Sequence, residues 1–189
     1  GRPADERGAQ DLFGDIRITS GKGDNHVICD RAAQTINLGR DDDKLFGGGG
    51  NDTVVITASA ADDFTDVVIE GGNGDDTIRL VGTADSADIN LGDGNDTLTF
   101  SGQIADGTGN ILGGEGGDLI NLDSAVYSSL NGYTVGGGGG NDTITLAEFG
   151  SAGSGAFALG GGGADSITIN ANLAQASASL VSAGAGFGT

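Results

Sequence analysis

The sequence predicts an all-β protein: a right-handed parallel β-helix with two short strands in each coil of 18 to 24 residues. Two observations point to this fold class. Blocks rich in Gly and Asp recur along a chain of 189 residues, 39 of which are Gly, and an apolar residue follows each block at a fixed offset. Repeats of this kind stack into a solenoid in which neighbouring coils bury one another.

The repeat has the form G-G-x-G-x-D-x-U-x, where U is an apolar residue. Six copies begin at Gly47, Gly71, Leu91, Gly113, Gly137 and Gly160. The Asp slot holds Asp52, Asp76, Asp96, Asp118, Asp142 and Asp165, and the U slot holds Val54, Ile78, Leu98, Ile120, Ile144 and Ile167. Two weaker copies precede them, at Ser20 to Ile28 and at Leu38 to Phe46.

The distance between copies requires a second strand in each coil. Short strands are predicted at Thr35 to Leu38, Asp66 to Ile69, Asp88 to Leu91, Asn110 to Leu112, Gly132 to Val135 and Ala156 to Leu159. Strand alternation turns every U residue inward, where the U residues stack as one ladder. The opposite wall is predicted to consist of Ile36, Leu38, Ile89, Leu91, Ile111, Phe157 and Leu159.

The repeats divide the chain into three parts. Residues 1–14 are expected to be an N-terminal extension and residues 15–170 the β-helix. Residues 171–189 are read as a further coil, a docking segment or a secretion segment. No apolar run reaches 18 residues, so membrane insertion is not expected.

The charge balance calls for a cationic partner. The chain carries 27 acidic residues against 8 basic ones, a formal net charge of -19. Nucleic-acid binding requires the opposite electrostatic footprint and is excluded. All the basic residues except Arg79 lie within the first 44 residues, so the long remainder repels itself unless a counter-ion binds.

The Gly/Asp turns are predicted to hold Ca²⁺. Glycine permits positive φ and lets carbonyl oxygens point into a turn, while stacked carboxylates repel one another. Calcium accepts six to eight oxygen ligands of both kinds, whereas zinc and copper would need Cys/His clusters. The predicted ligands are the six motif Asp residues, Asp41 and Asp43 on the second turn edge, and Gly48, Gly50, Gly72, Gly74, Gly92, Gly94, Gly114, Gly116, Gly138, Gly140, Gly161 and Gly163.

The six blocks resemble the hemolysin-type calcium-binding repeats of the RTX family over about residues 20 to 170. The resemblance implies a parallel β-roll, type I secretion, calcium-triggered folding outside the cell, and use in toxins, proteases, lipases, adhesins and S-layer proteins. The expected location is therefore extracellular or at the cell surface.

No catalytic signature occurs in the chain, and no catalytic or cofactor-binding residue is predicted. The single His26 cannot supply H-E-x-x-H, and neither Ser151 nor Ser154 has the Gly two residues earlier that a hydrolase elbow needs. The sequence therefore favours a protein that is not an enzyme.

Three functions remain open. The first is a structural subunit that packs head to tail with copies of itself into a filament, surface layer or matrix. The second is a calcium-folded module of a secreted adhesin or ice-binding protein, because Thr97 and Thr99, Thr143 and Thr145, and Ser166 and Thr168 place hydroxyls on one flat face. Arg79, Leu119 and Asn121 interrupt that face. The third is the RTX-like secretion domain of a toxin or enzyme.

Overall fold

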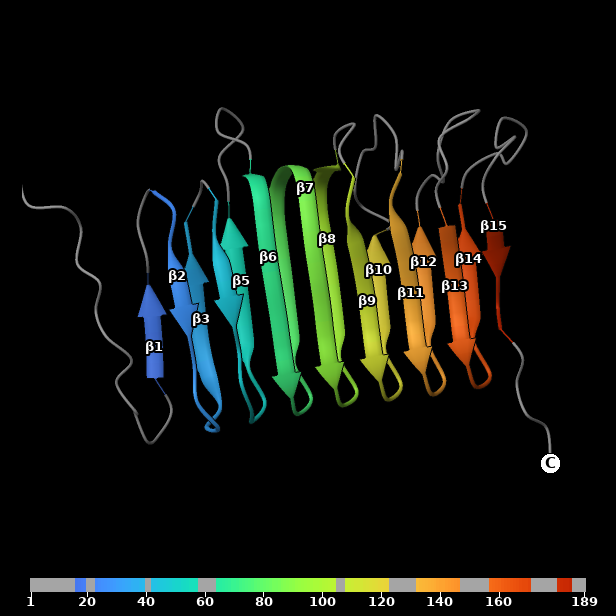
Figure 1. Ribbon diagram of the computed structural model, residues 1–189, viewed down its shortest axis with the longest axis horizontal. Coiled ribbons are helices and arrows are strands. Elements are labelled where there is room, and N and C mark those ends of the chain that lie inside the picture. Colours follow the sequence, from blue (N-terminus) through green and yellow to red (C-terminus); the bar gives the residue numbers. More distant parts are fainter. Residues whose placement is uncertain are drawn as a thin grey trace, which may run out of the picture.

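Every regular element of the described chain is a β-strand. The computed structural model describes residues 16–19, 23–39, 42–57, 64–104, 108–122, 132–146, 157–170 and 180–184. All pairings between its strands are parallel, and the strands stack side by side along one axis (Figure 1). The predicted all-β parallel solenoid is confirmed.

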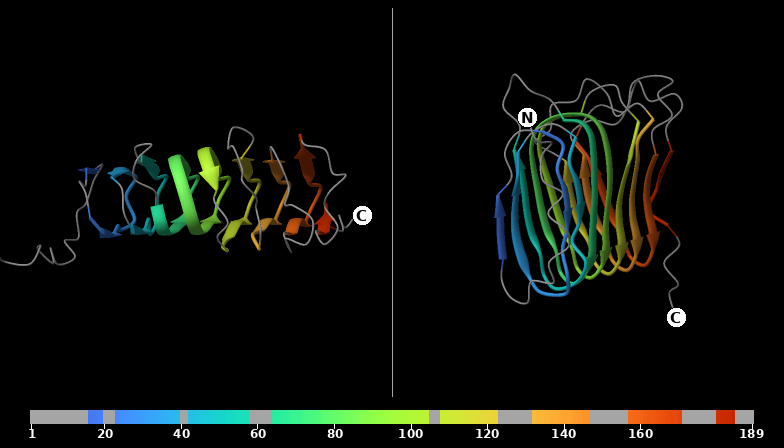
Figure 2. Two further views of the ribbon diagram at one scale, coloured as in Figure 1. Left: turned by 90° about the horizontal axis from the view of Figure 1, so that it is seen from above. Right: turned by 60° about the vertical axis from the view of Figure 1, so that its left-hand side comes forward.

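The strands form two walls. The first wall contains β1 (Ile16–Thr19), β3 (Gln34–Leu38), β5 (Thr53–Thr57), the start of β7 (Thr77–Asp93), β8 (Thr97–Ile104), β10 (Leu119–Leu122), β12 (Thr143–Leu146) and β14 (Ser166–Ile169). The second wall contains β2 (His26–Ile28), β4 (Lys44–Phe46), β6 (Phe64–Asn73), the end of β7, β9 (Asn110–Glu115), β11 (Thr134–Gly139), β13 (Phe157–Gly162) and β15 (Leu180–Ser182). Strand β7 bends from one wall into the other without a break (Figure 2).

The two edges that join the walls differ in length. The glycine edge leads from the second wall to the first through the Gly/Asp blocks, and it keeps one spacing: nine residues separate Ile69 from Ile78, as they separate Ile89 from Leu98. The variable edge leads from the first wall to the second. Coil length, measured from one motif Asp to the next, ranges from 20 to 24 residues. The variable edge therefore absorbs the differences.

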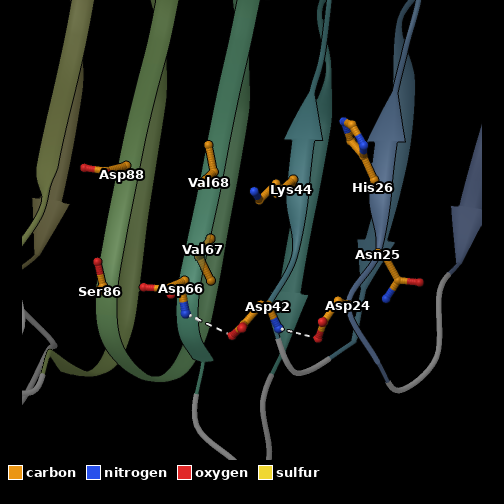
Figure 3. A pocket seen from close by; sticks show the side chains of 10 residues that line it. All are labelled: Asp24, Asn25, His26, Asp42, Lys44, Asp66, Val67, Val68, Ser86 and Asp88. Atoms are coloured by element: carbon orange, nitrogen blue, oxygen red, sulfur yellow. Dashed lines mark hydrogen bonds between the residues drawn. The ribbon is translucent and has the colours of Figure 1, made fainter.

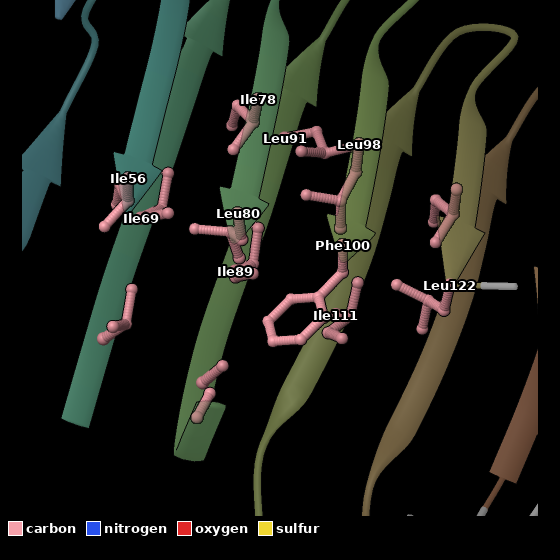
Figure 4. Close-up of a cluster of buried hydrophobic side chains, with 14 of the residues drawn as sticks. Ile56, Ile69, Ile78, Leu80, Ile89, Leu91, Leu98, Phe100, Ile111 and Leu122 are labelled. Carbon is pink, nitrogen blue, oxygen red and sulfur yellow. The ribbon is translucent and has the colours of Figure 1, made fainter. Parts of the chain in front are cut away.

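The interior is filled by apolar rows that run along the solenoid axis (Figure 4). The U residues from Val54 to Ile144 are buried, and Ile167 packs partly buried at their end. A second inward row on the same wall, which the sequence analysis did not single out, consists of Leu38, Ile56, Leu80, Phe100, Leu122 and Leu146. The facing row on the second wall consists of Leu45, Ile69, Ile89, Ile111, Val135 and Ala158. Each buried Leu or Ile contributes about 1.5–3 kcal/mol of transfer free energy.

The predicted opposite wall is wrong at its two ends. Ile36 pairs with Val54 and Leu38 with Ile56, so β3 belongs to the first wall and not the second. Near the C-terminal end, Ala158 pairs with Val135 and points inward. Because side chains alternate along a strand, Phe157 then faces outward and is 40% exposed, and Leu159 is only partly buried.

The two weaker copies of the motif lead into strands from the variable edge, which is the second turn edge of the sequence prediction. They lead into β2 and β4, which are second-wall strands. At the first turn of the glycine edge the chain has Cys29 to Ala33, without a glycine, and Gln34 in the Asp slot. The first two coils are also the shortest, because Gln34 and Asp52 are 18 residues apart.

The solenoid continues into the C-terminal segment. Strand β15 lies within residues 171–189 and pairs with β13, matching Ala158 to Val181. The expected N-terminal extension, residues 1–14, lies outside the described residues. Within the described ranges, no helix is long and apolar enough to cross a membrane.

Candidate metal centre

Six Asp side chains stack along the glycine edge, one per turn. Asp52, Asp76, Asp96, Asp118 and Asp142 are at most 2% exposed, and Asp165 is partly buried. Each Asp immediately precedes a first-wall strand, and the carbonyl of Asp52 accepts the N–H of Thr77 in the next coil at 2.8 Å. The sheet register thus brings the predicted Asp residues together in one row.

One oxygen of each carboxylate is committed to a hydrogen bond between coils. The backbone N–H of Asp52 donates to Oδ1 of Asp76 at 2.7 Å, and Asp76 donates likewise to Asp96. The chain of bonds continues through Asp118 and Asp142 to Asp165 at 2.8–2.9 Å. These bonds fix each carboxylate beneath the backbone of the preceding turn.

The second oxygen of each carboxylate has no hydrogen-bond partner. Oδ2 is buried without one in all six motif residues, Asp52, Asp76, Asp96, Asp118, Asp142 and Asp165. A buried acceptor without a donor costs about 1–3 kcal/mol, and more when it is charged. Six such atoms in a row are unusual for a native protein.

The first glycine slot makes room for this oxygen. A Cβ added at Gly71 would lie 2.7 Å from Oδ2 of Asp76. A Cβ at Gly113 or Gly137 would collide in the same way with the Asp of its own turn. A larger residue at this slot would thus compete with the carboxylate for space. Leu91, the one departure from glycine, is itself fully buried.

The glycines at positions two and four of the motif adopt a left-handed backbone. Their φ values run from 89° at Gly48 to 144° at Gly94. A Cβ at Gly72 or Gly74 would strike the carbonyl oxygen of the equivalent glycine in the preceding turn. Backbone carbonyls therefore lie between successive turns, and that of Gly48 accepts the N–H of Asn73 at 3.0 Å. Calcium binding by the twelve glycines at these positions stays a prediction.

A second ladder, which the sequence analysis missed, runs through the slot before the motif Asp. Oδ1 of Asn51 accepts the N–H of Asp75 at 3.1 Å, and Oδ1 of Asp75 accepts the N–H of Asn95 at 2.8 Å. Here the earlier coil supplies the acceptor, whereas in the buried ladder the later coil does. The repeated N-D and D-D pairs of the blocks were the available signal.

Burial makes the ladder costly to ionise. Burial raises the pKa of Asp52 to about 7, helped by the charges of Asp76 and Asp30 and opposed by the hydrogen bond from Gln34. It likewise raises the pKa of Asp96 and Asp118 to about 6. The ladder is therefore a column of like charges that a bound cation would stabilise.

A neutral amide ends the ladder at the first turn. The backbone N–H of Gln34 donates to Oδ1 of Asp52 at 2.7 Å, and its Nε2 donates to Oδ1 of Asp30 at 2.9 Å. Gln34 is 4% exposed. The first turn therefore continues the hydrogen bonding of the ladder, but because Gln34 is neutral it adds no charge. It also lacks the glycines of the later turns.

The acids predicted for the second edge are only partly described. Asp43 is buried, and its Oδ1 accepts the N–H of Asn25 at 3.0 Å; Asp41 lies outside the described residues. Asp24, Asp42 and Asp66 line an open groove beside β2, β4 and β6 (Figure 3), where the N–H of Asp66 donates to Oδ1 of Asp42 at 3.0 Å.

The donor set tests which metal the turns could hold. In the described part of the chain, no three His, Cys, Asp or Glu side chains gather into a group that could bind a metal ion. An ion at the glycine edge would therefore need backbone carbonyls to complete its coordination. Calcium accepts such mixed oxygen ligands, whereas protein sites for zinc and copper are built mainly on His and Cys side chains. The residues present fit calcium.

Comparison with known proteins gives no match to any family model, any curated protein or any solved structure. The structure itself shows a parallel β-solenoid with a buried column of Asp side chains along one edge.

Proposed function

We propose that this protein is a calcium-dependent extracellular solenoid in which Ca²⁺ binds between successive turns of the glycine edge. The row of buried Oδ2 atoms without partners carries the proposal. In this proposal the Asp carboxylates supply charged ligands to each ion, and the backbone carbonyls at motif positions two and four supply neutral ligands. Bound calcium would neutralise the column and link each coil to the next.

The proposed extracellular location agrees with the weak affinity expected of sites that form only as the chain folds. Calcium-binding modules that work outside cells bind with dissociation constants of about 10⁻⁴–10⁻³ M, which matches a site assembled only as the chain folds. The resemblance of the blocks to RTX repeats supports secretion. A chain of this design would stay unfolded at low calcium and fold after export.

The rod is proposed to serve as a structural unit that packs end to end with copies of itself. Within the described chain the first wall ends at β1 and β14 and the second at β2 and β15. Terminal strands of a parallel stack can pair with another chain, which would extend the rod into a filament or layer. No catalytic role forms part of this proposal.

A calcium titration of the full chain tests both parts. Far-ultraviolet circular dichroism is expected to report strand formation at millimolar Ca²⁺ but not at equal Mg²⁺, reversed by chelator. Sedimentation velocity on the same samples is expected to show large, chelator-reversible species. If sedimentation shows only a compact monomer in calcium, the assembly proposal fails and the calcium proposal stands. Identical spectra with and without Ca²⁺ would remove the calcium sites.

Two neighbouring residues provide a matched pair of variants. Asp76→Asn removes the charge of a buried motif carboxylate, whereas Asp75→Asn changes an exposed residue to the Asn that Asn51 and Asn95 already show at this slot. Loss of a charged ligand is worth about 1.5–3 kcal/mol. We expect a roughly tenfold or larger rise in the calcium midpoint for Asp76→Asn and about twofold or less for Asp75→Asn. Equal shifts would contradict the ligand assignment.

A further inference from the structure

The outer side of the first wall carries hydroxyl groups in strand register. The sheet pairing aligns one outward residue from each strand into a single row along the axis. This row is Arg17, Thr35, Thr53, Thr77, Thr97, Leu119, Thr143 and Ser166. Only Arg17 at the end of the row and Leu119 within it lack a hydroxyl, and every member except the half-buried Thr97 is exposed. We call these residues, with the parallel row two positions later, the hydroxyl face.

The second row of the hydroxyl face is less regular. It consists of Thr19, Asn37, Val55, Arg79, Thr99, Asn121, Thr145 and Thr168. Its members are polar except Val55, and Arg79 is exposed in the middle. Two rows therefore lie side by side along the wall, one nearly all threonine and one mixed.

The hydroxyl face avoids negative charge in a strongly acidic protein. The described first-wall strands contain no Asp or Glu, although the chain as a whole has 27. The second wall differs: Asp66, Glu70 and Asp88 all point outward from its strands. A cationic ligand of the hydroxyl face is therefore disfavoured, and the only described charges on this face are Arg17 and Arg79. Between these two residues, a neutral ligand would bind through hydrogen bonds and methyl contacts.

The spacing of the hydroxyls matches that of ordered water. Neighbouring strands lie about 4.8 Å apart. In a tetrahedral network with O–H···O lengths near 2.75 Å, second-neighbour oxygens are about 4.5 Å apart. Threonine is branched at Cβ and stiff about χ1, so its hydroxyl and methyl groups hold their positions at low entropic cost. A row from Thr35 to Thr97 therefore presents a regular template to water.

The composition of the face argues against other ligands. Saccharide or single-stranded nucleic-acid recognition uses aromatic stacking, and the one aromatic residue in the described first-wall strands, Phe100, is fully buried. A cationic mineral surface would need outward acids. We propose that the hydroxyl face binds the surface of ice, with row-one threonines as the principal contacts and Arg79 as the group that limits the fit.

The test uses the full chain in calcium and measures thermal hysteresis and inhibition of ice recrystallisation. Thr77→Lys places a long charged side chain in the middle of the first row and is expected to reduce both activities at least severalfold. Asn90→Lys makes the same change at an exposed position of the second wall and is expected to leave both unchanged. Arg79→Thr completes the second row and is expected to increase both.

Circular dichroism of each sample reports whether the chain is folded. Because the hydroxyl face depends only on the fold, this measurement separates the ice proposal from the calcium proposal. Ice growth at the rate seen in buffer, with the wild-type chain folded, would overturn the ice proposal alone. Equal losses in Thr77→Lys and Asn90→Lys would do the same. A chain that folds without calcium yet shapes ice would overturn only the calcium sites.

Discussion

The two edges of the solenoid join the same walls by different means. At the glycine edge one turn is repeated, with glycines of positive φ, a buried Asp column and an exposed Asx ladder. At the variable edge coil lengths differ. Among the described residues a ladder there covers only Asp24, Asp42 and Asp66, and other contacts occur once, such as the hydroxyl of Ser86 donating to the carbonyl of Thr108 at 2.9 Å. Repetition at one edge sets the register of the walls, which leaves the other free to vary.

The largest expected effect comes from lengthening the constant edge. Inserting Gly-Ser between Gly116 and Gly117 interrupts both ladders, because Asp118 donates to Asp142 and Gly117 donates to Asn95. Several bonds of about 1 kcal/mol each would be lost on both sides of the insertion. We expect a chain that no longer folds at calcium concentrations that fold the wild type.

The matched control inserts Gly-Ser after Val126, between the first-wall strand β10 and the second-wall strand β11. The lengths of the natural coils already differ by two residues or more at this edge. Doubling the length of a loop costs only about 0.6 kcal/mol in closure entropy. Urea melts in saturating calcium compare the two. A comparable loss from both insertions would show that the glycine edge does not set the register.

The next effect separates two adjacent glycines of one turn. Gly163 has a φ of +129°, and a Cβ there would strike the carbonyl of Gly140, whereas a Cβ at Gly162 would meet nothing closer than 4.0 Å. Left-handed strain costs about 1–3 kcal/mol, so Gly163→Ala should lose at least that much stability. Gly162→Ala should stay within about 0.5 kcal/mol. Chemical denaturation in calcium measures both, and a ranking in the other order would contradict the close-packed turn.

The pH dependence of the calcium-free chain tests the buried column. The pKa of Asp52 is about 7 and that of Asp96 and Asp118 about 6, all above the ordinary Asp value of about 3.9. The folded state therefore holds protons more tightly than the unfolded state. This contribution to stability is complete below about pH 4 and is lost as the pH rises through 6 to 7.

Calcium should reverse that dependence, because it competes with protons for the same carboxylates. We expect the chelated chain, which is unfolded at pH 7.5, to gain strand content as the pH is lowered to 5, and the calcium midpoint to fall as the pH rises over the same range. Circular dichroism at both pH values, with chelator and with calcium, checks this. Calcium-free stability that rises with pH would mean that the column is not buried as described.

How much the sequence could predict also differs between the edges. The blocks identified the motif Asp residues, the glycines and the U ladder because one rule holds in six copies. They misplaced Ile36 and Leu38, since β3 follows a turn of Cys29 to Ala33 that carries no glycine motif to assign it to the first wall. The same error kept Thr35 out of the outward row that Thr97 belongs to.

Side-chain contacts that occur once could not be predicted from a repeat. Gln34 ends the Asp column through a hydrogen bond to Asp30, and no second copy of that pair exists along the described glycine edge to reveal it. The orphaned Oδ2 atoms were also invisible, because burial of a carboxylate depends on how closely the turns stack and not on the motif itself. Repetition is readable from sequence, whereas single contacts require coordinates.

The smallest expected effect concerns such a single contact. Tyr133 is fully buried, and its hydroxyl oxygen accepts the N–H of Ala87, which lies two coils earlier, at 3.0 Å. The ring passes Gly109, where a Cβ would come within 2.8 Å of Cε1. Tyr133→Phe leaves the buried N–H of Ala87 without this acceptor, so we expect a loss of about 1–2 kcal/mol.

Because this contact belongs to the variable edge, its loss should leave the number of calcium ions bound at saturation unchanged. Urea melts and equilibrium dialysis on the same preparation measure stability and stoichiometry separately. Asp76→Asn, by contrast, should lower the stoichiometry, because it removes a ligand of the glycine edge. If Tyr133→Phe also released calcium, the two edges would be coupled through the core. The proposal that calcium binding depends on the glycine edge alone would then be wrong.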